Sequence, residues 1–112
     1  MDISLATGAF GALAQPTRLA VFRLLMTAGP EGMAAGAVAE KLGVPHNTLS
    51  THLGILSRAR LLTSRREGRS ILYAPDIEGV RALLSFLVAD CCSGRPELCA
   101  PLAAVVERAA CC

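Results

Sequence analysis

The fold is decided by residues 39–73, which read AEKLGVPHNTLSTHLGILSRARLLTSRREGRSILY. Ala39 is small, so the helix that carries it can lie close to the next helix. Gly43 can take the left-handed conformation that a sharp turn between two helices needs. Leu49, six residues after that glycine, supplies the apolar anchor of the second helix. Each feature alone is a weak signal, but the three together predict a helix-turn-helix.

The only β-like pattern of the chain follows directly. Leu62–Glu67 and Ser70–Tyr73 are separated by Gly68-Arg69, and a two-residue spacing of this kind is typical of a tight hairpin turn. A hairpin placed after a helix-turn-helix predicts the wing of a winged helix-turn-helix.

Further helices are predicted on both sides by apolar residues at helical spacing. Pro16 suits the first turn of a helix, Gly29-Pro30 ends that helix, and Asp76 can cap the helix after the hairpin. The expected fold class is therefore mostly α with a β-hairpin wing, completed by a short C-terminal helix. The expected helices cover about residues 3–14, 16–28, 34–42, 45–59, 77–89 and 101–110.

The positive charge of the chain is concentrated in its middle third. The whole chain of 112 residues has a net charge of only +2, which is uninformative by itself. Residues 41–75, however, hold six Lys and Arg against a single acid, a local net charge of +5. This distribution fits a surface that binds a polyanion, although charge alone fits a solvated basic surface equally well.

The second helix of the predicted helix-turn-helix presents a polar face opposite its leucines. This face is small and hydrogen-bonding near its start and cationic near its end, which suits insertion into a DNA major groove. The arginines of the hairpin can follow the backbone or enter a minor groove. The alternatives are an ordinary solvated face and a charged hairpin that discourages edge pairing. The residues expected at DNA are His46, Asn47, Thr48, Ser50, Thr51, His52, Arg58, Arg65, Arg66 and Arg69.

The same stretch resembles the DNA-binding half of the ArsR family of metal-responsive repressors. The likeness rests on Ser50-Thr51-His52-Leu53, on Arg66-Glu67-Gly68-Arg69 leading to Tyr73, and on Gln15-Pro16-Thr17-Arg18, and it covers roughly residues 9–90. It implies a winged-helix dimer that binds double-stranded operator DNA and uses its first and fifth helices as the interface. His52 matches a histidine common in the family, which is expected to hydrogen-bond to phosphate or within the fold.

A homodimer is also expected because 53% hydrophobic residues is a high fraction for so short a chain, so part of the apolar surface should be buried against a second copy. The predicted domain division is residues 1–90 for DNA binding and dimerisation, and residues 91–112 for a cysteine-rich sensor tail. The residues expected at the dimer interface are Phe10, Val80, Leu84 and Leu87.

All five cysteines lie in the last 22 residues. Cys91 and Cys92 end the predicted fifth helix, and the turn after them can bring Cys99 back, so that three thiolates converge. Three sulfurs suit As(III), or Sb(III), whereas zinc normally takes a fourth ligand. Cys111 and Cys112 are expected to form at most an accessory site. The alternatives are another soft metal, a redox-sensing disulfide between Cys91 and Cys92, and small buried hydrophobes without a sensing role.

The sequence therefore predicts an arsenite-responsive repressor of arsenical resistance that leaves its operator when As(III) binds the C-terminal thiolates. Many arsenic sensors of the family carry cysteines in the third helix, and its zinc sensors carry Asp and His on the fifth. This chain has neither set, and its site is similar to those of members with a C-terminal sensor.

Other classes fit less well. An enzyme is not expected because no His or cleft-forming motif accompanies the cysteines and both histidines lie in the second helix of the helix-turn-helix. A thiol-rich metal buffer would leave the basic middle third and the helix-turn-helix unexplained. The chain shows no signal peptide and no apolar stretch long enough to span a bilayer. We therefore expect a cytoplasmic protein with reduced thiols and no membrane partner.

Overall fold

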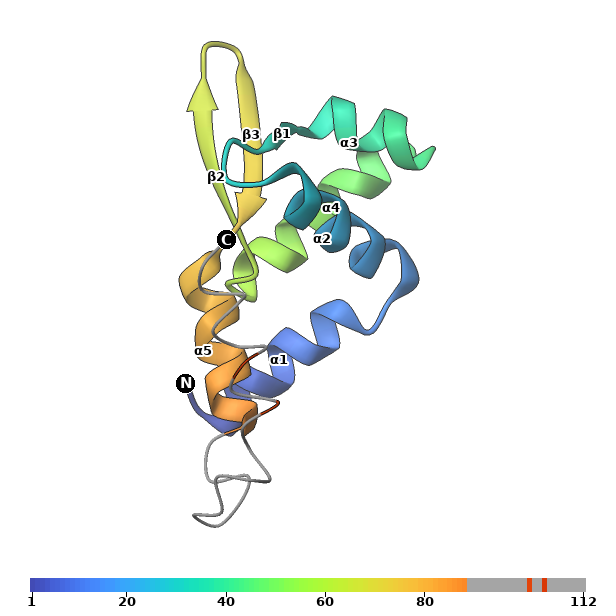
Figure 1. Ribbon diagram of the computed structural model, residues 1–112. Coiled ribbons are helices and arrows are strands. Elements are labelled where there is room, and N and C mark those ends of the chain that lie inside the picture. Colours follow the sequence, from blue (N-terminus) through green and yellow to red (C-terminus); the bar gives the residue numbers. More distant parts are fainter. Residues whose placement is uncertain (89–100, 102–103, 105–112) are drawn as a thin grey trace.

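The computed structural model describes residues 1–88, 101 and 104 of the chain (Figure 1). The five predicted helices of this part are all present, within two residues of the expected bounds. Of the expected C-terminal helix, only Pro101 and Ala104 are described, and both are helical. The helices are α1 (Ile3–Leu13), α2 (Pro16–Ala28), α3 (Ala35–Leu42), α4 (His46–Arg58) and α5 (Ile77–Val88), and the strands are β1 (Met33–Ala34), β2 (Leu62–Glu67) and β3 (Ser70–Pro75).

The helix-turn-helix is formed by α3 and α4, as the spacing of small and apolar residues predicted. Gly43 ends α3 in the left-handed region with a φ of 65°, and the N–H of Val44 donates to the carbonyl oxygen of Ala39 at 3.1 Å. Ala39 is buried where the two helices meet. The leucine stripe of α4, which includes Leu49 and Leu53, is fully buried and anchors the helix in the core.

The hairpin forms in the predicted register, with Glu67 opposite Ser70 and Gly68-Arg69 as the turn. Gly68 has a φ of 62°, while Arg69 does not have a positive φ; this matches a type II′ turn, which has glycine at its first central position.

The expectation that the hairpin contains the only strands is wrong, because a third strand is present outside it. The two-residue strand β1 pairs antiparallel with β3, with Met33 opposite Tyr73, and gives a sheet of order β1-β3-β2. Gly32 brings the chain close to this partner: a Cβ there would lie 2.7 Å from the carbonyl oxygen of Tyr73. Two residues are too short to show an alternating pattern in the sequence. The strand therefore exists only because β3 provides an edge for it. Pairing with β2 extends β3 two residues beyond its predicted end, to Pro75.

One core holds all these elements together. Burying a leucine or valine side chain contributes about 1.5–3 kcal/mol, so the fully buried aliphatic residues dominate the stability. The buried residues that α1 contributes to this core are all alanines, while Leu13 is partly buried and packs against it. The buried residues are Ala6, Ala9, Ala12, Val21, Leu25, Val38, Ala39, Leu49, Leu53, Leu56, Leu61, Leu62 and Leu83.

The end of α4 is joined closely to the start of α5. Arg60 has a φ of 62°, and the N–H of Leu61 donates to the carbonyl oxygen of Leu56 at 3.0 Å, a hydrogen bond typical of a Schellman motif. The carboxylate of Asp76 accepts from the N–H of Gly79 at 3.0 Å, which confirms the predicted cap of α5. Gly79 touches the backbone of Arg60, and a Cβ there would overlap the carbonyl oxygen of that residue.

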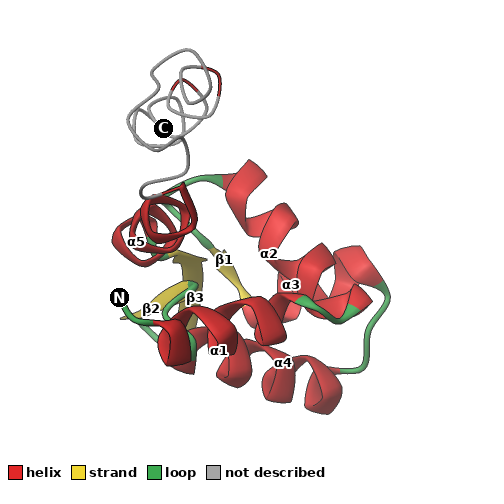
Figure 2. Cartoon of the chain, turned by 90° about the horizontal axis from the view of Figure 1, so that it is seen from below, coloured by secondary structure: helices red, strands yellow, loops and turns green. Residues whose placement is uncertain are grey.

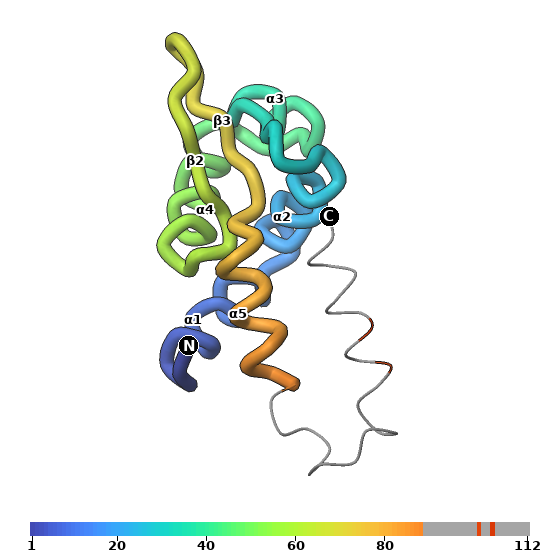
Figure 3. Tube along the Cα trace, turned by 60° about the vertical axis from the view of Figure 1, so that its left-hand side comes forward, coloured from blue at the N-terminus to red at the C-terminus, as the bar shows by residue number. Residues whose placement is uncertain are grey.

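The wing and the α1–α5 pair lie at opposite ends of the domain, as both Figure 1 and Figure 3 show. In Figure 2, α1 lies between α5 on the left and α4 on the right, and it contacts both helices. Within the described residues, no helix is long and apolar enough to cross a membrane.

Candidate nucleic-acid interface

The outward face of α4 is a continuous polar surface. His46, Asn47, Thr48, Ser50 and Thr51 are all exposed, as expected from a helix whose leucines point inward. The amide oxygen of Asn47 accepts from the N–H of Thr48 at 3.0 Å, and the hydroxyl of Thr51 donates to the carbonyl oxygen of Asn47 at 3.3 Å. The first two turns therefore present hydroxyl, amide and imidazole groups that can hydrogen-bond to base edges.

Arg58 extends this face at the end of α4. Its guanidinium lies over Gly54, with Nη1 only 3.3 Å from the position that a Cβ of that glycine would take. The missing side chain lets the arginine lie back along its own helix. The exposed face therefore ends in a cation, as the sequence predicted.

His52 is the one predicted DNA residue of α4 that is half-buried. Its Nδ1 lies 3.4 Å from Nη1 of Arg18, and Nε of Arg18 donates to the carbonyl oxygen of Ala12 at 2.6 Å. One arginine therefore joins the end of α1 to the middle of α4. Of the two roles expected for His52, this contact favours hydrogen bonding within the fold.

Sequence reasoning missed the positioning role of Arg18. The sequence did single out this residue, because Arg18 belongs to the segment Gln15-Pro16-Thr17-Arg18, but that segment indicated only the family resemblance. The N–H of Arg18 also donates to the side-chain oxygen of Gln15 at 2.7 Å, which caps α2.

The three wing arginines are all exposed but have different surroundings. Arg65 donates to the carbonyl oxygens of Pro30 at 3.4 Å and Glu31 at 2.9 Å, and its Nη2 lies 3.5 Å from the carboxylate of Glu67. These contacts join β2 to the loop after α2. Within the described part of the chain, Arg66 and Arg69 make no side-chain hydrogen bond or ion pair, so their cations are available to a polyanion.

The wing and the helix-turn-helix lie at the same end of the domain (Figure 3). Arg66 and Arg69 therefore add their charge to the side that carries α3 and α4. A polar helix flanked by a cationic hairpin is the arrangement that winged-helix proteins use to read one groove and hold the neighbouring backbone.

The residues expected at the dimer interface are only partly exposed. Leu87 is 58% exposed and Phe10 is 41% exposed. Val80 and Leu84 are half-buried, and Val80 packs against the core of its own chain. Of the three α5 residues expected at the interface, Leu87 alone is exposed in a single copy.

The five cysteines lie outside the described residues, so the predicted metalloid site at Cys91, Cys92 and Cys99 and its accessory pair, Cys111 and Cys112, remain predictions from the sequence. Within residues 1–88, no three His, Asp or Glu side chains come together as a metal-binding group.

Comparison with known proteins identifies the fold's relatives. A family model described as a helix-turn-helix domain matches residues 13–65. The nodulation protein NolR of Rhizobium meliloti is 35% identical over 86 residues, which cover 77% of this chain and 68% of NolR. The solution structure of the fragment 1–100 of Mb0332 from Mycobacterium bovis superposes with a TM-score of 0.65 at 29% identity, over 79% of this chain and 81% of that one. That fragment is described as a homodimeric winged helix-turn-helix DNA-binding domain of a possible ArsR-family regulator. The chain belongs to the ArsR family.

Membership of the ArsR family confirms the fold and the class of function predicted from the sequence. The protein is a winged-helix transcriptional regulator and not an enzyme. A crystal structure described as a possible transcriptional regulator for arsenical resistance is also similar to this ArsR-family chain. The identity is 30% and the TM-score 0.61, over 69% of this chain and 77% of the other.

Proposed function

We propose that this ArsR-family protein is a cytoplasmic repressor that binds a pseudo-palindromic operator as an apo homodimer and dissociates from it when As(III) binds its C-terminal thiolates. The observation that carries the DNA-binding part is the exposed polar face of α4 beside two unpaired wing arginines, Arg66 and Arg69, in the described structure. The effector part rests on the chemistry of the cysteine cluster.

Each part of the DNA surface has a distinct role. Asn47, Ser50 and Thr51 read base edges in the major groove, with His46 and Thr48 beside them at the start of α4. The residues that bind the phosphate backbone are Arg58, Arg66 and Arg69. Arg65 also faces this side, but its hydrogen bonds to Pro30 and Glu31 must compete with any phosphate, so its main contribution is to hold the wing.

Dimerisation would cover apolar surface that one copy leaves in water. Phe10 on α1 and Leu87 on α5 are exposed, and both helices lie at the end away from the wing (Figure 1). Exposed apolar side chains gathered on adjacent helices are typical of an interface. The similar Mb0332 fragment is described as homodimeric, which supports the same assembly here. Val80 and Leu84 would complete the α5 face of that interface.

The cysteine tail supplies the ligands for the effector. Three thiolates suit a soft ion that accepts three sulfurs, and As(III) or Sb(III) meets that requirement. The similarity to a possible regulator of arsenical resistance supports this choice. Reduced thiols are the normal state in the cytoplasm, where a DNA-binding regulator acts.

In this proposal, release follows from the position of the ligands in the sequence, where they begin a few residues after the last described residue of α5. Drawing Cys91, Cys92 and Cys99 together would restructure the chain that follows α5 and shift the dimer to a geometry in which its two α4 helices are wrongly spaced. A coupling of about 1–3 kcal/mol would weaken operator binding roughly 5–150-fold.

The deciding experiment is an electrophoretic mobility shift with operator DNA, with and without arsenite under reducing conditions. We expect the wild type to bind and arsenite to release it, while Cys91→Ser, Cys92→Ser and Cys99→Ser bind but are not released. Serine keeps the size of the side chain and removes the soft ligand. Release of Cys99→Ser by arsenite would remove that residue from the site. Release by a thiol oxidant but not by arsenite would favour a redox sensor instead.

A further inference from the structure

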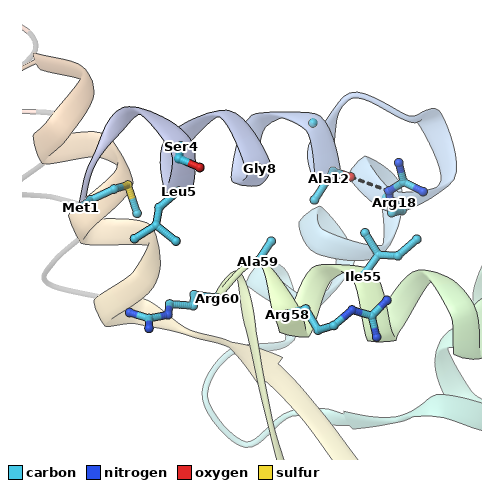
Figure 4. A pocket seen from close by; sticks show the side chains of 11 residues that line it. Met1, Ser4, Leu5, Gly8, Ala12, Arg18, Ile55, Arg58, Ala59 and Arg60 are labelled. Carbon is cyan, nitrogen blue, oxygen red and sulfur yellow. Dashed lines mark hydrogen bonds between the residues drawn. The ribbon is translucent and has the colours of Figure 1, made fainter.

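A hollow of about 420 Å³ lies between α1 and α4 (Figure 4). Its volume is in the range of small-molecule sites, which is about 300–1,000 Å³. Leu5 and Ala12 from α1 and Ile55 from α4 give it apolar walls on its two sides (Figure 4). The described residues that line it are Met1, Ser4, Leu5, Gly8, Gly11, Ala12, Arg18, Ile55, Arg58, Ala59 and Arg60, and we call this hollow the α1–α4 groove.

Two glycines in the middle of α1 keep the groove open. A Cβ added to Gly8 or Gly11 would meet no atom within 4 Å, and both residues have ordinary helical backbone angles. Neither close packing nor backbone conformation within the chain therefore requires glycine at these positions. Glycine inside a helix costs about 0.5–1 kcal/mol relative to alanine. Space in the groove is the feature that these two residues provide.

Among the described residues, the charged side chains of the groove are all arginines. Arg18, Arg58 and Arg60 line it, and no Asp or Glu of residues 1–88 does. Arg18 and Arg58 face the same end from opposite sides, while Met1 and Leu5 lie at the other end together with Arg60 (Figure 4). Arg18 is held in place by the carbonyl oxygen of Ala12 at 2.6 Å, so part of this cationic end is preorganised.

The groove does not lie on the face of α1 that the proposed dimer uses. Helical residues advance by about 100° each, so Phe10 and Ile3 share one face and Gly8 points to the opposite side. Both Phe10 and Ile3 are exposed, at 41% and 73%. A second copy that packs on them would leave the groove free.

We propose that the α1–α4 groove binds an amphipathic organic carboxylate, with its carboxylate between Arg18 and Arg58 and its apolar chain along Gly8 and Leu5. No carboxylate of the described residues lines the groove beside these two guanidinium groups, and the carboxylate of such a ligand would supply the counter-ion. The neighbouring hollow carries Asp76 and Glu78, which disfavour an anionic head group at that far end.

A carboxylate bound in the groove would also affect operator binding, an effect that rests on the proposed function. Arg58 is also assigned to operator phosphate, so a bound carboxylate would compete with DNA for the same cation. The binding test needs neither DNA nor arsenite, so its failure would leave the proposed repressor function untouched.

The test is isothermal titration calorimetry of the full-length reduced protein with decanoate below its micellar concentration, with decanol as the uncharged comparison. We expect one decanoate per chain and no measurable binding of decanol. Arg58→Gln should weaken decanoate binding about tenfold or more, because a charge-assisted hydrogen bond is worth about 1.5–3 kcal/mol. Gly8→Leu should abolish binding by filling the groove.

Matched controls carry the same changes elsewhere. Arg23→Gln removes an exposed α2 arginine that does not line the groove, and Ala37→Leu adds the same side chain to an exposed site on α3; both should bind decanoate like the wild type. Circular dichroism establishes that each variant is folded. If Gly8→Leu fails to fold, the exposed Arg58→Gln still decides the question. Wild type that does not bind decanoate, or that binds decanol equally well, would overturn the proposal, as would unchanged affinity in Arg58→Gln.

Discussion

Replacing Gly79 by alanine should destabilise the protein although alanine is the better helix former. A Cβ at this position would overlap the carbonyl oxygen of Arg60 and lie 3.0 Å from its carbonyl carbon, where non-bonded carbons prefer about 3.5–4.0 Å. The neighbour is backbone in a left-handed turn fixed by Leu61, so it has little freedom to move. Overpacking typically costs about 1–3 kcal/mol; an overlap with backbone belongs at the upper end of this range, and the helical gain of alanine returns about 1 kcal/mol. We expect a net loss of about 2 kcal/mol.

The assay is urea unfolding followed by circular dichroism, at one fixed protein concentration because dimerisation contributes to the measured stability. Gly8→Ala is the matched control, since its Cβ meets nothing within 4 Å, and it should gain about 0.5–1 kcal/mol. The two identical substitutions should therefore have opposite signs. A Gly79→Ala protein as stable as the wild type would refute the close packing of α5 on Arg60.

Three further predictions concern DNA, assembly and the tail. Arg69→Ala should make the slope of log K against log salt concentration less steep by about 0.9 for each lost phosphate contact, and each dimer would lose two such contacts. Mobility-shift assays at a series of salt concentrations measure this slope. An unchanged slope would show that the turn of the wing does not touch DNA. Leu87→Glu should give a folded monomer by analytical ultracentrifugation that no longer binds operator, since this side chain is 58% exposed in one copy, and an intact dimer would exclude it from the interface. Truncation after Ala110 should leave release by arsenite nearly unchanged while arsenic bound per chain falls or stays the same; loss of release would move Cys111 and Cys112 into the primary site.

Local sequence signals predicted most of the fold correctly. Pro16 marks the start of α2, Gly43 forms the turn after α3, and Asp76 caps α5, because each acts on backbone groups within a few residues. The exposed face of α4 followed from the same local geometry, since the leucine stripe fixes which side of the helix points outward. These signals required no knowledge of the rest of the chain.

Interactions between distant residues were not predicted. The bond between Arg65 and Glu31 spans 34 residues, and so does the contact between Arg18 and His52. In the sequence Arg65 is one of three similar wing arginines, and only its place beside the loop after α2 distinguishes it. Strand β1 likewise has no pattern of its own and depends on the edge of β3.

The sequence by itself determined the helices, the turn of the helix-turn-helix, the hairpin and the family, because capping, helical periodicity and glycine turns are properties of neighbouring residues. Within residues 1–88, the tertiary structure decided which arginines are held by hydrogen bonds to the protein and which make none. It also decided that Gly79 must pass close to Arg60, and that Gly8 and Gly11 open a cationic groove. The physical reason is that burial and hydrogen bonding depend on which distant segments pack together. An arginine or glycine looks the same in the sequence whether a carbonyl group or open space lies beside it.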